Sequence, residues 1–288
     1  MPEMPPLPNA SAAEPETVFD APRTEFYEGR WAEPDRSAGS LRNWLVKKER
    51  FFLQRLPRTG NLRVLDLGCG GGWQVFARAG RTVGVDLSPL SLHGAATIYH
   101  GVAACDLTRL PWRDGSFDLV VSSDVLGHIP LDVKQHAIDE IYRVVKPGGR
   151  TLHYIEAEGD DPLTAFAKRD LALYRRRIIG PEGHEGIEAP SATCRRFRAA
   201  GFRPVAEQPV YRLLMYPPRV VQLYDNEYAR RSLPLGLAVG VSKAVTRLAP
   251  LALASSLVAA GVLEVTDRLL PPDWGSGVLV EYQKPVTA

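Results

Sequence analysis

A glycine-rich turn follows an apolar stretch at a place suited to binding a ligand through the backbone. Residues 64–73 read VLDLGCGGGW, a pattern typical of a buried strand and then a tight turn. At the carboxyl end of a parallel strand, bare backbone lets a ligand approach N–H groups at the start of the next helix. A dinucleotide fingerprint is excluded, because its last glycine would fall on Trp73 or Val75. The residues spell D-x-G-x-G-x-G, from Asp66 to Gly72.

Two further acids follow the next two predicted strands. Asp86 closes the run VGVD, 20 residues after Asp66. A carboxylate there can accept hydrogen bonds from two ribose hydroxyls. The alternative is a helix N-cap acid before LSPLS. Asp106 comes just past the third predicted strand, where an ordinary turn aspartate is the alternative to a ligand-binding one.

Strand-like and helix-like segments alternate through the first two thirds of the chain. Short apolar strands separated by helices indicate a parallel sheet covered on both faces, so we predict a doubly wound α/β fold. The strand-like runs are 63–67, 82–86, 101–105, 117–123, 149–157 and, last in the chain, 277–285.

Four motifs in this order resemble those of the class I S-adenosylmethionine-dependent methyltransferases. VLDLGCGGG is similar to their first motif and VGVDLS to their second. Residues 105–129 resemble the third and fourth, and IYRVVKPGGR at 141–150 resembles the turn into the fifth strand. The resemblance covers roughly residues 60–157. It implies a Rossmann-like seven-stranded sheet with an antiparallel last strand, methyltransferase activity and S-adenosyl-L-methionine as the cofactor.

The resemblance also implies roles for individual residues. Asp66 and the glycine turn would hold the methionine end of the cofactor, with Cys69 contributing a small side chain rather than a reactive thiol. Asp86 would bind the ribose, and Asp106 would accept from the adenine amino group. The cofactor-binding residues implied are Asp66, Gly68, Cys69, Gly70, Gly72, Asp86, Leu87, Asp106, Leu107, Ser122 and Ser123.

Methyl transfer makes modest demands on the protein, because a sulfonium carbon is already electrophilic and the acceptor needs mainly to be held in line. An acceptor that must lose a proton needs a base, and we predict His128 for that role, against packing at a helix start as the alternative. Many family members carry glutamate before this histidine, whereas this chain has Gly127. The predicted substrate-side residues are Tyr27, Trp31, Asp124 and His184.

Composition indicates an ordinary globular protein. Its 288 residues carry a formal net charge of +2, and no basic run interleaved with aromatics suggests nucleic acid as a partner. The six histidines form no closely spaced set with acids, so no metal site is predicted. Three widely spaced cysteines and an N-terminus without a signal-peptide pattern favour a cytoplasmic location. The oligomeric state is left open.

The predicted organisation has five parts. The segment 210–275 differs in composition, and its run 248–263 has no charged residue. That run is interpreted as a buried or lid-forming helix, an interfacial amphipathic element or, least favoured, a membrane span. The parts are a disordered tail at 1–20, a helical lid at 21–57, the cofactor-binding core at 58–209, an apolar helical insertion capping the substrate site at 210–275, and the last strand with the C-terminus at 276–288.

Three functions from different classes fit these features. The first is methyl transfer to an oxygen, less readily to a nitrogen or carbon, of a small-molecule acceptor that is hydrophobic or lipid-linked. The second is a catalytically inactive cofactor-binding partner or regulatory protein, suggested by Gly127. The third is a membrane-surface interaction protein acting through residues 233–263, so peripheral membrane contact also remains an alternative.

Overall fold

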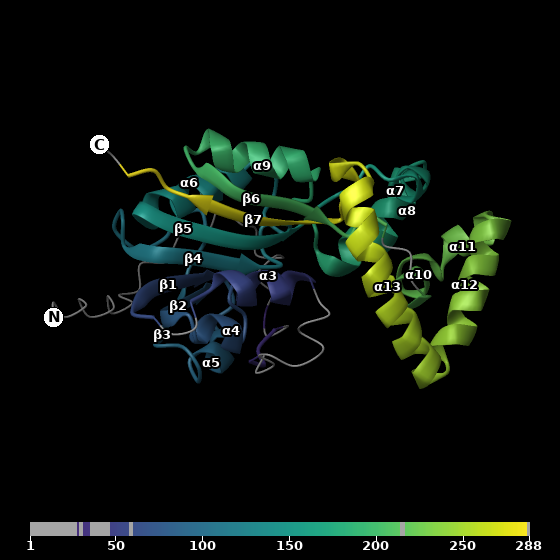
Figure 1. Cartoon of the computed structure of the whole chain (residues 1–288), viewed down its shortest axis with the longest axis horizontal. Helices are drawn as coiled ribbons and strands as arrows, with labels where there is room; N and C mark the ends of the chain where they lie inside the picture. The colour runs from purple at the N-terminus through teal and green to yellow at the C-terminus, as the bar shows by residue number, and fades with distance from the viewer. Residues whose placement is uncertain (1–27, 29–30, 35–46, 58–59, 214–216, 287–288) are drawn as a thin grey trace.

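A single seven-stranded sheet lies at the centre of the computed structural model, which describes residues 28, 31–34, 47–57, 60–213 and 217–286 (Figure 1). The strand order is β3-β2-β1-β4-β5-β7-β6. The last strand in sequence, β7, runs antiparallel to both of its neighbours, and the other pairs are parallel. The strands are β1 (Leu62–Leu67), β2 (Gly80–Asp86), β3 (Gly101–Ala104), β4 (Phe117–Ser123), β5 (Val145–Glu156), β6 (Arg203–Val210) and β7 (Gly277–Gln283).

Helices cover both faces of the sheet, as the alternating pattern predicts. On one face, α6 (Lys134–Val144) and α9 (Pro190–Ala199) pack with side chains of β4, β5 and β7. On the other, α3 (Lys47–Arg55), α4 (Gln74–Ala77) and α5 (Leu92–Ala95) complete a second apolar cluster. The predicted doubly wound, mostly parallel fold is therefore confirmed.

The loops after β5 contain short helical segments that carry one wall of the site described below. In chain order these are α7 (Pro162–Ala167), α8 (Leu171–Tyr174), the π-helical turn η1 (Arg175–Ile179) and the 3₁₀ turn η2 (Gly180–Glu182). Asp161 and Asp170 cap the first two helices by accepting hydrogen bonds from backbone N–H groups.

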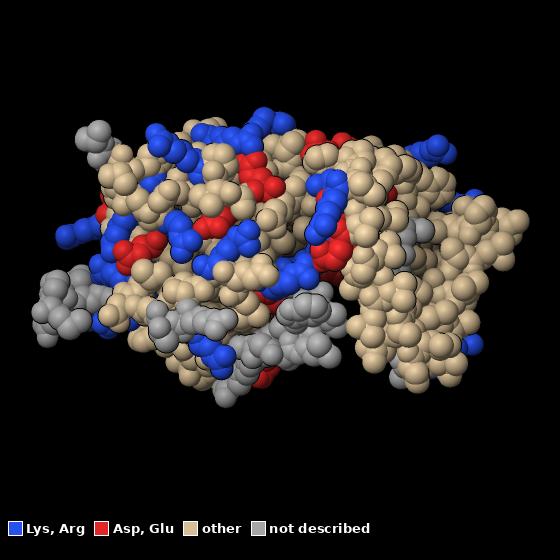
Figure 2. Space-filling model, viewed as in Figure 1, with Lys and Arg blue, Asp and Glu red and all other residues tan. Residues whose placement is uncertain are grey.

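The segment between β6 and β7 is helical, in agreement with the composition of 210–275. Figure 2 shows charged side chains spread over the sheet and its covering helices, whereas the surface over α12 and α13 has few of them. The helices are α10 (Pro217–Tyr224), α11 (Glu227–Arg231), α12 (Leu233–Thr246) and α13 (Ala249–Leu269), followed by the 3₁₀ turn η3 (Pro272–Trp274).

The predictions for the N-terminal region meet the structure only in part. The tail predicted at 1–20 lies outside the described residues, and so does Tyr27. Of the predicted lid at 21–57, the structure describes residue 28, residues 31–34, which cross the glycine turn, and residues 47–57, which include α3. Two side chains of α3 line the pocket beside that turn.

Candidate functional site

A pocket of about 530 Å³ opens at the carboxyl ends of the parallel strands, where doubly wound folds bind ligands. This volume lies within the usual range of about 300–1,000 Å³ for small-molecule sites. Its lining includes ten predicted cofactor residues and three predicted substrate or catalytic residues on strand ends and loops. These are Asp66, Gly68, Cys69, Gly70, Gly72, Asp86, Leu87, Asp106, Leu107, Ser123, Asp124, His128 and His184, with Trp31 from the N-terminal segment.

The glycine turn has the backbone conformation that its composition predicts, but one of its glycines contacts the N-terminal segment of the chain. Gly68, Gly70 and Gly72 have φ values of +57°, +50° and +84°, in the left-handed region where side chains are strained. Gly71 is required for another reason, because a Cβ there would lie 2.4 Å from the backbone of Glu33. The N–H of Gly71 donates to the carbonyl of Trp31. The turn thus seats the N-terminal segment as well as bordering the pocket.

Asp66 is buried at the base of the pocket. Tyr99 Oη donates to its Oδ2 at 2.6 Å, and the N–H of Trp73 donates to the same phenol at 2.7 Å. Burial, opposed by the Tyr99 hydrogen bond and assisted by the charge of Asp86, raises the pKa of Asp66 to about 8. A cationic ligand group beside this carboxyl would favour its ionised form.

The acids after β2 and β3 both border the pocket while making hydrogen bonds to the backbone. Asp86 accepts from the N–H of Gly70 at 2.8 Å and from that of Ser88 at 2.9 Å, which ties the glycine turn to β2. Burial raises the pKa of Asp86 against these hydrogen bonds. Asp106 accepts through Oδ1 from the N–H and the hydroxyl of Thr108, so it also forms the turn that was its alternative interpretation.

The structure at the end of β4 corrects the prediction that Ser122 borders the cofactor site. Ser122 does not line the pocket: its hydroxyl is fully buried and shares a 2.6 Å hydrogen bond with Nδ1 of His153. Successive strand residues face opposite sides of a sheet, so Ser122 and Ser123 cannot both reach the ligand side. Asp124 follows with a φ of +61°, and its carboxylate pairs with Lys48 of α3.

Burial makes the two pocket thiols poor nucleophiles. It raises the pKa of Cys105 to about 12, and it raises the pKa of Cys69 further, with the nearby carboxylates of Asp66 and Asp86 adding to the effect. A thiol needs a lowered pKa to react as a thiolate. The geometry therefore supports the view of Cys69 as a small side chain rather than a reactive one.

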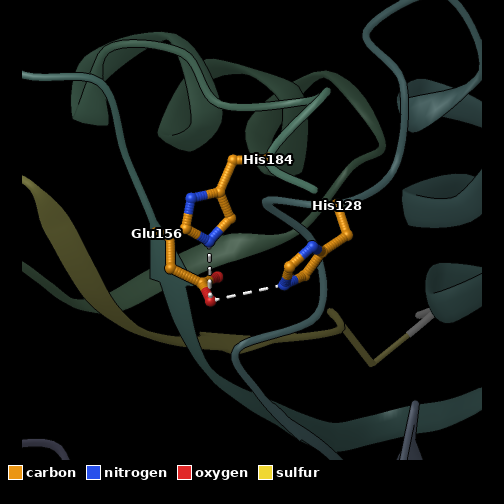
Figure 3. A group of neighbouring side chains, drawn as sticks. All are labelled: His128, Glu156 and His184. Carbon is orange, nitrogen blue, oxygen red and sulfur yellow. Dashed lines mark ion pairs between the residues drawn. The ribbon is translucent and has the colours of Figure 1, made fainter. Parts of the chain in front are cut away.

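His128, Glu156 and His184 all line the pocket and converge on one another (Figure 3). Glu156 Oε1 lies 3.7 Å from Nε2 of His128 and 3.6 Å from Nε2 of His184, and the two imidazole centroids are 4.8 Å apart. His128 Nδ1 lies 3.1 Å from the carbonyl of Gly183. A carbonyl only accepts, so Nδ1 carries the proton, and Nε2, the atom nearest to Glu156, is the nitrogen that gains or loses a proton.

Charge and burial shift the pKa values of this group in opposite directions. Burial lowers the pKa of His128, but the hydrogen bond and charge of Glu156 outweigh it, and the net pKa lies above the usual value of 6.5. Burial raises the pKa of Glu156, but the two histidines outweigh it and hold the carboxyl well below its usual range. Glu156 is therefore an anion placed to stabilise a protonated His128.

The same three side chains could hold a divalent metal ion. One ligand atom from each of them lies within 4.8 Å of the others, and two histidines with a glutamate form a familiar zinc ligand set. Sequence spacing did not predict this grouping, because the three residues come from the loop after β4, the end of β5 and the turn after η2. The arrangement thus allows two chemical roles, general base or metal ligand.

Glu156 and Lys48 are the main site residues that sequence reasoning missed. A Cβ on Gly127 would lie 2.9 Å from Oε2 of Glu156, so the absent side chain leaves room for this carboxylate. The only signal for Glu156 is its position at the end of a strand that ends beside β4 in the doubly wound order. Lys48 gives no such signal, because its place on α3 follows no strand end and belongs to none of the four motifs.

The predicted cap over the pocket is corrected by the structure. Among the described residues that line the pocket, none comes from 210–275. The run 248–263 forms most of α13, in which Leu263 is buried and the larger apolar residues are otherwise largely exposed. The interpretation as a buried helix is therefore wrong.

The fold and the pocket define a doubly wound α/β protein with a small-molecule site at the carboxyl edge of its sheet. Residues 65–153 match the family described as a methyltransferase domain. An uncharacterised methyltransferase of Synechocystis sp. is 39% identical over 46% of this chain and 65% of its own. The probable tRNA methyltransferase 9B of Mus musculus is 30% identical over 54% of this chain and 34% of its own.

Other relatives are named as a demethylmenaquinone methyltransferase, from Lactiplantibacillus plantarum, and an arsenite methyltransferase, from Aquipseudomonas alcaligenes. Among solved structures, an S-adenosylmethionine-dependent methyltransferase from Mesorhizobium loti matches with a TM-score of 0.50 at 19% identity. The match covers 83% of this chain and 98% of that one, and it supports the fold.

Residues 65–153 of this chain belong to the methyltransferase domain family, in agreement with the resemblance of the four sequence motifs to class I S-adenosylmethionine-dependent methyltransferases. The chain spans between 34% and 65% of the length of the two curated relatives compared above.

Proposed function

We propose that this protein transfers a methyl group from S-adenosyl-L-methionine to an oxygen of a small hydrophobic or lipid-linked acceptor, with His128 as the general base. The observation that carries the proposal is the pairing of His128 with Glu156 inside the pocket that also contains Asp66 and Asp86. A hydroxyl acceptor must lose its proton as the new bond forms, and this pair is suited to accept it.

Each residue of the pair has a distinct part in the reaction. When bound, the cofactor would supply an electrophilic methyl group, and transfer of that group to the acceptor oxygen would release S-adenosylhomocysteine. His128 Nε2 takes the hydroxyl proton, while its Nδ1–H stays bonded to the carbonyl of Gly183. The carboxylate of Glu156 stabilises the imidazolium that forms, as a buried anion beside a developing cation should. His184 contacts the same carboxylate and helps to fix its position.

Glu156 also bears on the alternative of an inactive cofactor-binding protein. That alternative rests on Gly127, where many family members carry a glutamate. In this chain Glu156 approaches the space beside Gly127 and lies next to His128. A carboxylate is thus present near the histidine, supplied by another strand, and this supports an active enzyme.

The family does not fix the acceptor, because relatives are named for tRNA, demethylmenaquinone and arsenite. A small acceptor is supported by the size of the pocket and by the mixed charge of the surface in Figure 2. An apolar acceptor is supported by the exposed apolar helices of the 210–275 segment.

The test uses cofactor with a deuterated methyl group. Purified protein is incubated with three separate pools, a lipid extract, water-soluble metabolites and bulk tRNA, and the products are analysed by mass spectrometry. Label on an oxygen of a lipid-soluble molecule is the expected result, and label on tRNA alone would contradict it. His128→Ala serves as the inactive control.

A metal at His128, Glu156 and His184 is the second candidate, favoured by the close approach of their ligand atoms. In that case the acceptor oxygen would be activated by the ion, and His128 would not accept a proton. Treatment with a chelator distinguishes the two roles of His128, general base and metal ligand. Activity that survives metal removal supports the base, whereas activity lost to chelation and restored by Zn²⁺ supports the metal.

A further inference from the structure

The helices α12 and α13 form an apolar hairpin, defined here as residues 233–269, whose outer surface meets no other part of the described chain (Figure 1). One face of α12 packs on α10 and the helices after β5 through Leu235 and Val239. The opposite face is exposed, with the Leu233 side chain at 79% and Val241 at 65%. The hairpin is thus held on one side and open on the other.

Exposed apolar residues lie on more than one side of α13. Val258 and Leu253, exposed to 67% and 62%, are five residues apart and point about 140° away from each other around the helix axis. A 20-residue stretch, Pro250–Leu269, is apolar and long enough to cross a membrane, yet only 6% of its most apolar window is buried in the protein. It is therefore neither the core helix of a soluble domain nor, this late in the chain, a signal sequence.

The distribution of charge favours lipid as the medium that covers this surface. Between residues 233 and 263 the charged residues are Lys243 and Arg247, near the tip of the hairpin, and both are cations. A helix that is apolar all round is usually buried in a protein core or a membrane. A protein partner or a second copy would cover one defined face, whereas lipid covers several sides at once. Lys243 pairs with Asp225 at 2.7 Å, and Arg247 suits anionic phospholipid head groups when the hairpin lies along the membrane surface.

The topology excludes a helix that crosses the bilayer. β7 follows the hairpin and pairs between β5 and β6, so the chain enters and leaves the hairpin on the same side. With 14 residues, α12 is about 21 Å long, shorter than the roughly 30 Å hydrocarbon core. With 21 residues, α13 is about 31 Å long, roughly twice the thickness of one leaflet, so the hairpin must lie along the membrane within one leaflet.

The base of the hairpin is fixed to the wall of the pocket. Lys47 of α3 donates to Asp267 at 2.8 Å and to the carbonyl of Leu263 at 3.0 Å, and Arg50 pairs with Glu264. The next residue of α3, Lys48, lines the pocket and pairs with Asp124. One helix therefore links the apolar hairpin to the site.

We propose that the apolar hairpin inserts into one leaflet of a membrane containing anionic lipid and holds the pocket at the membrane surface. Where the proposed function holds, this placement selects acceptors that carry a lipid chain. Membrane binding itself needs neither cofactor nor acceptor, so it can be tested independently of the methyl transfer.

The experiment is flotation of the full chain with vesicles of phosphatidylcholine alone and of phosphatidylcholine with phosphatidylglycerol. The hairpin variant is Leu253→Glu with Val258→Glu. The matched control is Leu171→Glu with Val205→Glu, which places the same charges at residues exposed to 57% and 56% outside the hairpin. Cofactor binding by calorimetry shows that each variant is folded.

We expect the wild type to bind the anionic vesicles more strongly than the neutral ones, the control to bind like the wild type, and the hairpin variant to bind at least about tenfold more weakly. Absence of wild-type binding to either vesicle, or equal binding by the hairpin variant, would overturn the proposal. A dimer that the hairpin substitutions dissociate, together with no vesicle binding, would overturn it in favour of a second copy. Vesicle binding by a wild-type protein that transfers no methyl group would overturn the proposed function alone.

Discussion

The central sheet and the apolar hairpin both come from charge-poor stretches of sequence, but the fold treats them in opposite ways. In β1, the side chains of Val64, Leu65 and Leu67 are completely buried. In α13, Leu253 and Val258 are more than 60% exposed. The contrast teaches that an apolar pattern identifies residues for which contact with water is unfavourable. It does not show which other groups contact them in place of water. Neighbouring strands and helices replace it in the sheet, and the hairpin needs a medium from outside the described chain.

The largest expected effect is on the reaction in the pocket at the edge of the central sheet. His128→Ala removes the proposed base and should lower kcat by about 10²–10⁴-fold, with cofactor affinity within about threefold of the wild type. Steady-state kinetics and calorimetric titration measure the two quantities. His136→Ala, at an exposed position on α6, is the matched control and should leave both unchanged. Equal rates for the two variants would rule out the base.

The comparison is tested most directly by one substitution made in both regions. Leu65→Ala should reduce the free energy of unfolding by about 2–5 kcal/mol, because it leaves a cavity in a packed core. Leu253→Ala should change it by no more than about 0.5 kcal/mol when lipid is absent, because the side chain contacts mainly solvent. Urea denaturation without detergent gives both values. Similar losses at the two positions would mean that protein covers the hairpin.

Cofactor affinity should depend strongly on the acid at the end of β2. Asp86→Ala removes the predicted ribose ligand and the acceptor for the Gly70 N–H, so the Kd for S-adenosyl-L-methionine should rise about 10–100-fold. Calorimetric titration gives the Kd. Asp132→Ala removes an exposed carboxylate on the loop before α6 and should bind the cofactor normally. Unchanged affinity in Asp86→Ala would contradict the ribose assignment.

The smallest expected effect is a displacement of the pH profile. The proposed base must be neutral, so kcat/KM should fall as pH drops through the pKa of His128, which lies above 6.5. Glu156→Gln removes the charge that raises this pKa, so the acid limb should move to lower pH. Rates measured from pH 5 to 9 show the limb. A limb that stays in place in Glu156→Gln would show that Glu156 does not act through His128.

The sequence was sufficient to predict the sheet and most of the cofactor wall, because these depend on local patterns. Glycine spacing determines the turn, and the ends of parallel strands bring Asp66, Asp86 and Asp106 to one edge. The Ser122 error has a local cause as well, since strand alternation allows only one of two adjacent serines to face the ligand. Use of the two-residue period of a strand would have limited the prediction to one of the two serines, which the structure shows to be Ser123.

The parts that could not be predicted depend on contacts between distant segments. Glu156 reaches His128 and His184 only because β4 and β5 pair and the turn after η2 folds back over them. Lys134, buried in α6, helps to hold that turn by donating to the carbonyl of Gly186 at 2.8 Å. Likewise, the composition of 248–263 could not distinguish a buried helix from an exposed one, because the two require the same residues.

The position of β7 also has a consequence for how the protein is made. This strand is the last described element of the chain, and its residues Val278, Val280 and Tyr282 lie at the fully buried centre of the sheet between β5 and β6. During synthesis from the N-terminus, the hairpin leaves the ribosome before β7 does. The sheet can therefore be completed only after the apolar helices have already been exposed to the water or membrane outside the ribosome. A nascent chain stopped before residue 277 would expose the hairpin while β5 and β6 still lack the strand that joins them.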